Sequence, residues 1–202
     1  MYYHGVDSVT GFVLAGGKSS RMGQDKAFLQ LRGRTLLAHA LERAQAATGN
    51  AWIVGSAEKF AAFGPVVEDM YPGRGPLAGI QAALAGTRTD LNLITAVDMP
   101  FLQLDLLNYL ITRARASKAE VVVPRAGGGL QPLCAVYWKD FAEVAQRSLR
   151  AGRNKVDSLF AEVQTLIIEQ QELERNGFGE EMFRNLNTEQ DWQEAKQKLS
   201  AR

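Results

Sequence analysis

Short apolar runs alternate with segments of helical spacing along the first two-thirds of the chain. The runs are rich in β-branched and aromatic residues, which predicts buried strands at 9–14, 51–54, 65–67, 91–97 and 120–124. Between them, helices are predicted from Glu58 onward and over 36–44, 77–85 and 104–116. This alternation is typical of an α/β domain with a mostly parallel sheet that helices cover on both faces.

The last third of the chain has a less regular order of elements. Strands are expected at 132–138 and 163–168, with helices near 141–149 and from Thr188. No linker-like composition, low-complexity run or internal repeat sets these elements apart from the earlier ones. We therefore expect them to complete the same sheet, so that residues 1–202 form a single domain.

Composition and charge narrow the classes of ligand. The 202 residues are 46% apolar, and 23 Lys and Arg nearly balance 22 Asp and Glu. A net charge of +1 gives no overall field for nucleic acid or a membrane surface, so neither is an expected partner. Cys134 is the only cysteine, the N-terminus lacks a basic leader, and no run of about 18 apolar residues occurs. We expect a cytoplasmic protein that holds any anionic ligand in a local site.

Residues 15–26 follow the first predicted strand and combine small residues with cations. The glycines allow a close backbone approach to a ligand, and Arg21 and Lys26 can neutralise phosphate oxygens. This pattern indicates a triphosphate cradle; the alternative is an ordinary surface turn. A Walker A loop is excluded because Phe12 stands where that motif needs glycine. A dinucleotide fingerprint at 73–78 is rejected because its proline removes a backbone amide.

Two aspartates follow predicted strands. Asp98 closes a core-like strand at the end where open α/β sheets bind ligands, and Mg²⁺ prefers carboxylate and phosphate oxygens. The alternative is an aspartate that caps the next turn. Asp69 lies beside Glu68, where a solvated acidic pair is an equally good interpretation. The glycine segment at 73–79 either brings a helix N-terminus close to a base or ribose, or simply joins a strand to a helix.

The sequence lacks the residues that several other classes of enzyme or binding protein need. His4 and His39 are the only histidines, and neither has neighbours at metal-ligand spacing, which argues against a zinc hydrolase. No Gly-x-Ser-x-Gly elbow of a serine hydrolase occurs. Aromatic residues and cations do not alternate along one element as a nucleic-acid platform requires.

Residues 14–26 read Leu-Ala-Gly-Gly-x-Ser-x-Arg-Met-Gly-x-Asp-Lys, which resembles the signature loop of the molybdenum cofactor guanylyltransferases. Three further segments resemble the same family in the expected order. They are Glu-Asp and Gly-Pro-Leu-Ala-Gly within 68–79, Val-Asp-Met-Pro at 97–100, and Asn-Leu-Asn-Thr at 185–188. Together the four segments span almost the entire chain.

The resemblance implies a Rossmann-like three-layer sandwich. Residues from about 8–100 would bind the nucleotide, and residues from about 101–202 would present the acceptor. The implied nucleotide contacts are Leu14, Ala15, Gly16, Gly17, Lys26, Asp69, Gly75, Gly79 and Asp98, with Mg²⁺ on Asp98. The implied catalytic residues are Arg21, Lys26 and Asp98. The acceptor would contact Gln131, Pro132, Asn185 and Asn187, and Arg125, Arg153, Asn154 and Lys155 are further polar or basic residues of that half.

The implied activity is transfer of GMP from GTP to the terminal phosphate of molybdopterin, with release of pyrophosphate. A phosphate nucleophile is already anionic, so orientation and charge neutralisation would carry catalysis without a strong base. Rival interpretations are a molybdopterin cytidylyltransferase, a sugar-phosphate nucleotidyltransferase, and a nucleotide-binding regulator without turnover. The Leu-Ala-Gly-Gly form resembles the guanylyl branch, but Gly55 and Ser56 stand where that branch often has asparagine. Transient contact with other proteins of molybdenum cofactor biosynthesis is also expected.

Overall fold

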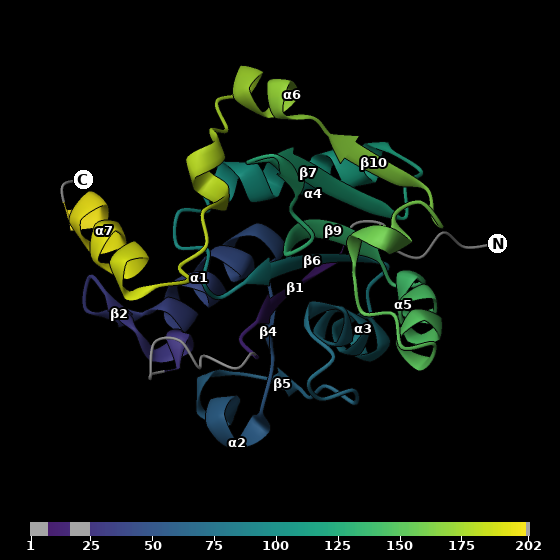
Figure 1. Cartoon of the computed structure of the whole chain (residues 1–202), viewed down its shortest axis with the longest axis horizontal. Coiled ribbons are helices and arrows are strands. Elements are labelled where there is room, and N and C mark those ends of the chain that lie inside the picture. Colours follow the sequence, from purple (N-terminus) through teal and green to yellow (C-terminus); the bar gives the residue numbers. More distant parts are fainter. Residues whose placement is uncertain (1–7, 17–24, 201–202) are drawn as a thin grey trace.

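The computed structural model describes residues 8–16 and 25–200 and contains an eight-stranded sheet between two layers of helices (Figure 1). The strand order is β10-β7-β9-β6-β1-β4-β5, and β8 pairs with β7. The strands are β1 (Val9–Leu14), β4 (Ala51–Val54), β5 (Val66–Val67), β6 (Leu91–Ala96), β7 (Val121–Ala126), β8 (Gly129–Leu130), β9 (Cys134–Trp138) and β10 (Thr165–Ile168). Strand β9 runs antiparallel to β6 and β7, whereas β10-β7, β6-β1, β1-β4 and β4-β5 are parallel pairs. The predicted mostly parallel sheet is confirmed.

Helices cover both faces of this sheet. Helices α1 (Leu36–Thr48) and α4 (Leu104–Ala116) pack on one face, and α3 (Pro76–Gly86) and α5 (Phe141–Arg150) pack on the other. The shorter α2 (Ala57–Phe60) and α6 (Gln170–Arg175) lie at the periphery, and α7 (Glu189–Ser200) packs its Ala195 against the α1 side (Figure 1). The predicted three-layer α/β architecture is confirmed.

Local sequence explains where α1 begins and ends. The Thr35 hydroxyl accepts a hydrogen bond from the Ala38 amide at 3.1 Å, and the helix ends at Gly49 with φ of 81°. Its buried residues are Leu36, Leu37, Ala40 and Ala44. The helix packs so closely on β1 that a side chain at Gly11 would meet the Thr48 hydroxyl at 2.9 Å.

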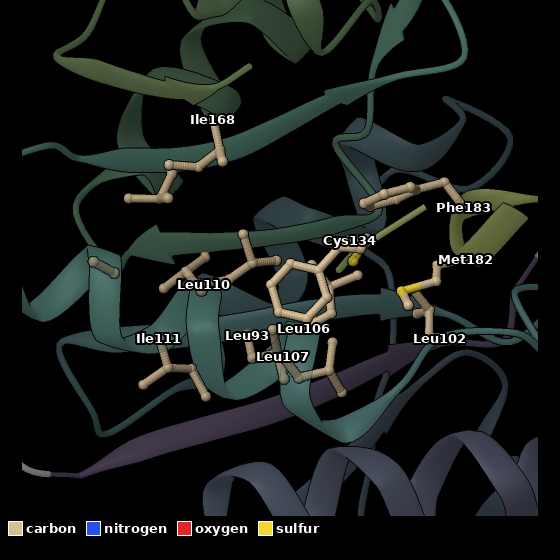
Figure 2. Packing of buried hydrophobic residues seen from close by; sticks show 14 of the residues in the cluster. Leu93, Leu102, Leu106, Leu107, Leu110, Ile111, Cys134, Ile168, Met182 and Phe183 are labelled. Atoms are coloured by element: carbon tan, nitrogen blue, oxygen red, sulfur yellow. The ribbon is translucent and has the colours of Figure 1, made fainter. Parts of the chain in front are cut away.

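The packing on the α4 face involves residues from distant parts of the chain. Figure 2 shows Leu106, Leu107 and Leu110 of α4 together with Leu93 of β6 and Cys134 of β9. Met182 and Phe183, from a 3₁₀ turn at Glu180–Phe183, join the same cluster. Burial raises the pKa of the Cys134 thiol to about 12, as expected of a cysteine that serves as a small apolar side chain.

Several short elements were not predicted. Residues 30–35 form a hairpin of β2 (Gln30–Leu31) and β3 (Arg34–Thr35), whose loop residues Arg32 and Gly33 have φ of 52° and 74°. A 3₁₀ turn, Lys26–Phe28, replaces the end of the expected loop, and α6 was also missed. Elements of two to six residues carry too little periodicity to be recognised from the sequence. None of the helices in the described part of the chain has the length and hydrophobicity needed to cross a bilayer.

Candidate active site

A cavity of about 590 Å³ lies where β1, β4 and β6 end. Eight of the predicted nucleotide contacts line it together: Leu14, Ala15, Gly16, Lys26, Asp69, Gly75, Gly79 and Asp98. Gly17 and Arg21 lie outside the described residues. Five further lining residues belong to segments that the sequence analysis discussed without predicting a contact, namely Asp25, Gly55, Gly73, Pro76 and Val97, and Val54, Ala96 and Leu133 were not discussed. The parallel strands bring these segments together because their carboxyl ends meet at one edge of the sheet.

The cation and the carboxylate that were predicted to be catalytic meet in this cavity. The Lys26 ammonium lies 3.0 Å from the Asp98 carboxylate, and both side chains are about one-fifth exposed. Lys26 also donates to the side-chain oxygen of Asn187 at 3.1 Å. A half-buried cation of this kind can bind phosphate oxygens, and the carboxylate beside it can bind a cation.

The chain that carries Asn187 is held in place by Asp191. The Asp191 carboxylate accepts hydrogen bonds from the amides of Asn187 and Thr188 and from the Thr188 hydroxyl, at 2.8 to 3.0 Å. Arg184 pairs with the other carboxylate oxygen at 3.1 Å. The Thr188 hydroxyl and Arg184 lower the pKa of Asp191 to about 2. Sequence reasoning missed this residue, although Thr188 followed three residues later by an acid is the pattern of a capping box.

A second contact ties the same segment to the strand end. The Leu186 amide donates to the Asp98 carbonyl at 2.9 Å, and the Leu186 side chain is fully buried. On the other side of Asp98, the guanidinium of Arg43 donates to the Met99 carbonyl at 3.3 Å. Burial lowers the pKa of Arg43 to about 10. The turn that follows β6 is therefore supported from both α1 and the C-terminal segment.

Glu68 and Asp69, the acidic pair at the end of β5, make different contacts. The Glu68 carboxylate accepts from the Ala57 amide at 2.8 Å, at the start of α2 and away from the cavity lining. The Asp69 carboxylate lines the cavity and accepts from the Tyr71 amide at 2.6 Å. The loop beyond is anchored by Arg74, which donates to the Leu149 carbonyl at the end of α5 at 2.8 Å.

Three glycines around the cavity have a special backbone conformation or a close neighbour. Gly75 has φ of 73° and precedes α3, where Pro76 occupies the first turn. A side chain at Gly79 would meet Leu14 at 3.1 Å, so this residue also serves helix-to-sheet packing. A side chain at Gly55 would meet the Phe60 ring at 2.8 Å. A larger residue at 55 would therefore require the Phe60 ring to shift; Gly55 and Ser56 are the two positions where the resembled branch often has asparagine.

The residues predicted to contact the acceptor are not all brought together. Asn187 reaches Lys26, and Gln131 lines a separate cavity. The Pro132 carbonyl accepts from the Tyr137 hydroxyl, and Asn185 is exposed. Arg125 and Arg153 form ion pairs with Glu169 and Glu162. Six of the described residues from the predicted acceptor half line neither of these two cavities: Arg125, Pro132, Arg153, Asn154, Lys155 and Asn185.

The carboxylates of the cavity suit a cation shared with a ligand. Asp25, Asp69 and Asp98 line it, and Asp25 forms an ion pair with Lys59 at 2.9 Å. Among residues 8–16 and 25–200, no group of three His, Cys, Asp or Glu side chains could hold a metal by itself. Mg²⁺ bound by one or two carboxylates completes its coordination with phosphate oxygens and water. The donor chemistry around Asp98 fits such an ion.

A glycine-lined cavity at the carboxyl ends of parallel strands, with a lysine and an aspartate inside, defines a nucleotide-binding protein of the α/β class. Residues 11–166 match the MobA-like NTP transferase domain, and the chain belongs to that family.

The similarity to known proteins extends over nearly the whole chain. A protein of Carboxydothermus hydrogenoformans named "Probable molybdenum cofactor guanylyltransferase" is 32% identical over 93% of this chain and 95% of its own length. A molybdenum cofactor guanylyltransferase of Desulfosudis oleivorans is 31% identical over 97% of this chain and 98% of its own. The crystal structure of molybdopterin-guanine dinucleotide biosynthesis protein A from Archaeoglobus fulgidus has a TM-score of 0.84 and 25% identity, over 96% of this chain and all of that one.

Proposed function

We propose that this protein transfers GMP from GTP to the terminal phosphate of molybdopterin. The observation that carries the proposal is the pair of Lys26 and Asp98, 3.0 Å apart in a glycine-lined cavity of about 590 Å³. The names of relatives that match along nearly their full length support guanine as the base and molybdopterin as the acceptor. The cytoplasm remains the expected location.

The transfer exchanges one phosphoanhydride bond for another. An oxygen of the acceptor phosphate forms a bond to the α-phosphorus of GTP, the bond to the bridging oxygen breaks, and pyrophosphate leaves with the electron pair. Lys26 neutralises phosphate charge, and the backbone at Ala15 and Gly16 can approach the nucleotide closely. Arg21 is expected to neutralise further phosphate charge. Asp98 would hold Mg²⁺, which supplies further charge neutralisation when bound.

Calorimetric titration with GTP, CTP, ATP and UTP, each with Mg²⁺, tests the nucleotide. We expect clear preference for GTP. Preference for CTP would point to a cytidylyltransferase, and the absence of nucleotide binding would refute the proposal.

Release of pyrophosphate tests the transfer itself. With GTP and molybdopterin present, we expect pyrophosphate to appear in step with the dinucleotide product. GTP binding without pyrophosphate release would favour a regulator that holds the nucleotide without turnover.

A further inference from the structure

A second cavity, of about 480 Å³, lies beside the nucleotide cavity. Two segments of the chain connect them. Gln131 lines the second cavity, and Leu133, two residues later, lines the first. Arg184 lines the second, and Asn187, three residues later, contacts Lys26 in the first. Two or three residues span at most about 7 to 11 Å. One elongated ligand can therefore occupy both cavities.

The walls of the second cavity are held by defined contacts. Phe183 lines it and packs into the core near Met182 and Cys134, as Figure 2 shows. The side-chain amide of Gln131 donates to the Ala126 carbonyl at 2.9 Å, which leaves the amide oxygen of Gln131 to accept. Arg184 is held by Asp191. These contacts fix three of the side chains that line the cavity.

One carboxylate in this cavity is available to a ligand. Arg184 pairs with Asp191 and with Glu194, and Glu181 pairs with Lys198 at 2.8 Å. Glu180 has no hydrogen-bond or ion-pair partner in the part of the chain that the structure describes.

The backbone opposite Glu180 leaves room for its carboxylate. Oε1 of Glu180 would lie 3.2 Å from a side chain at Gly127, and Gly127 has φ of 59°. Glycine at 127 therefore meets a requirement of the backbone and lets the carboxylate lie against the loop.

We propose that the second cavity binds the pterin ring of the acceptor, with Glu180 accepting hydrogen bonds from the ring N3–H and the 2-amino group. This inference rests on the proposed function. A pterin presents these two donors side by side, and a carboxylate accepts two parallel N–H bonds in a geometry that no neutral side chain matches. The phosphate arm of the acceptor then extends toward Lys26 and Asp98. The cavity volume lies in the range of small-molecule sites.

A comparison of two ligands tests this inference. We would titrate the full chain with fluorescent 6-hydroxymethylpterin and with 6-hydroxymethyl-lumazine, which carries a carbonyl oxygen in place of the 2-amino group. The wild type should bind the pterin about tenfold more tightly, because lumazine turns an acceptor toward Glu180. Glu180→Gln should lose this preference, since its amide offers one acceptor and one donor.

Glu181→Gln is the matched control, because the Glu181 carboxylate already pairs with Lys198 and Arg184. It should keep the preference for the pterin. Equal affinity of the wild type for the two ligands, no pterin binding at millimolar concentration, or an unchanged preference in Glu180→Gln would overturn the inference. A separate GTP titration distinguishes the two proposals: pterin preference without GTP binding contradicts the proposed function alone, and GTP binding without pterin preference contradicts this inference alone.

Discussion

The two halves of the molecule build their parts of the site in different ways. In the first half of the chain, strand ends and glycine loops place backbone and short side chains around a cavity, as at Ala15, Gly16 and Gly75. In the other half, charged side chains fix the chain, and Arg184 and Asp191 are the clearest example. Backbone-built sites depend on close packing, whereas side-chain networks depend on hydrogen bonds between distant residues. Substitutions in the first half should therefore act through packing, and substitutions in the second half should act through lost hydrogen bonds.

The largest effect is expected from Asp98→Ala. Loss of the carboxylate that would hold the metal should lower kcat by about 1,000-fold or more while the fold is kept, because the group is one-fifth exposed and not a core residue. Pyrophosphate release measures the activity, and circular dichroism checks the fold. Asp90→Ala is the control, since Asp90 lies at the opposite end of the same strand and pairs with Lys139. Full activity in a folded Asp98→Ala protein would remove Asp98 from the site.

The next largest effect is expected from Lys26→Ala. Loss of a charge-assisted contact to phosphate should lower kcat/KM for GTP by about 10- to 100-fold. Lys139→Ala, which changes an exposed lysine at the ends of the strands opposite the cavity, should leave kcat/KM unchanged. An unchanged kcat/KM for Lys26→Ala would exclude the lysine from nucleotide binding.

Asp191→Ala tests whether the C-terminal network acts through Asn187. Because Asp191 holds the Asn187 and Thr188 amides, its loss should lower kcat by about tenfold or more with little change in GTP affinity. Asn187→Ala should have a similar effect. In a double-mutant cycle the two losses should not add, because both remove the same contact to Lys26. Additive losses would show that Asp191 acts independently of Asn187.

Gly79→Ala tests how closely α3 packs on the sheet in the first half of the chain. Its new methyl group would meet Leu14 at 3.1 Å, whereas in Gly86→Ala of the same helix it would meet Val67 at 3.6 Å, an ordinary contact. The Gly79→Ala protein should be less stable than the Gly86→Ala protein by about 1 to 3 kcal/mol. Urea unfolding measures both. Equal stabilities would mean that α3 does not rest tightly on β1.

The smallest effect concerns acid stability. The pKa of Asp191 is lowered from 3.8 to about 2, so its ionised form stabilises the folded state above pH 3.8. That contribution is lost as the pH falls from 3.8 toward 2. The Asp191→Asn protein lacks the ionisable carboxylate and so has no such contribution to lose. Its free energy of unfolding should therefore fall less over this range than that of the wild type. The free energies of unfolding are measured by urea unfolding at several pH values. An equal fall in the two proteins between pH 3.8 and 2 would contradict this expectation.

The main strands, the helix start at Thr35 and the position of Asp98 could all be predicted from the sequence by itself. Each depends on residues within a few positions along the chain: a β-branched run, a hydroxyl before a helical pattern, a carboxylate that closes an apolar segment. The parallel arrangement then follows from the alternation of elements, and it brings the strand ends to one edge.

Only the tertiary structure decided which distant groups meet. Lys26 and Asn187 are 161 residues apart, and no local pattern links them. The antiparallel direction of β9, the role of Asp191 and the cavity beside Gln131 likewise depend on contacts across the chain. Periodicity reports which face of an element is buried, but the partner of a polar side chain is chosen by the fold.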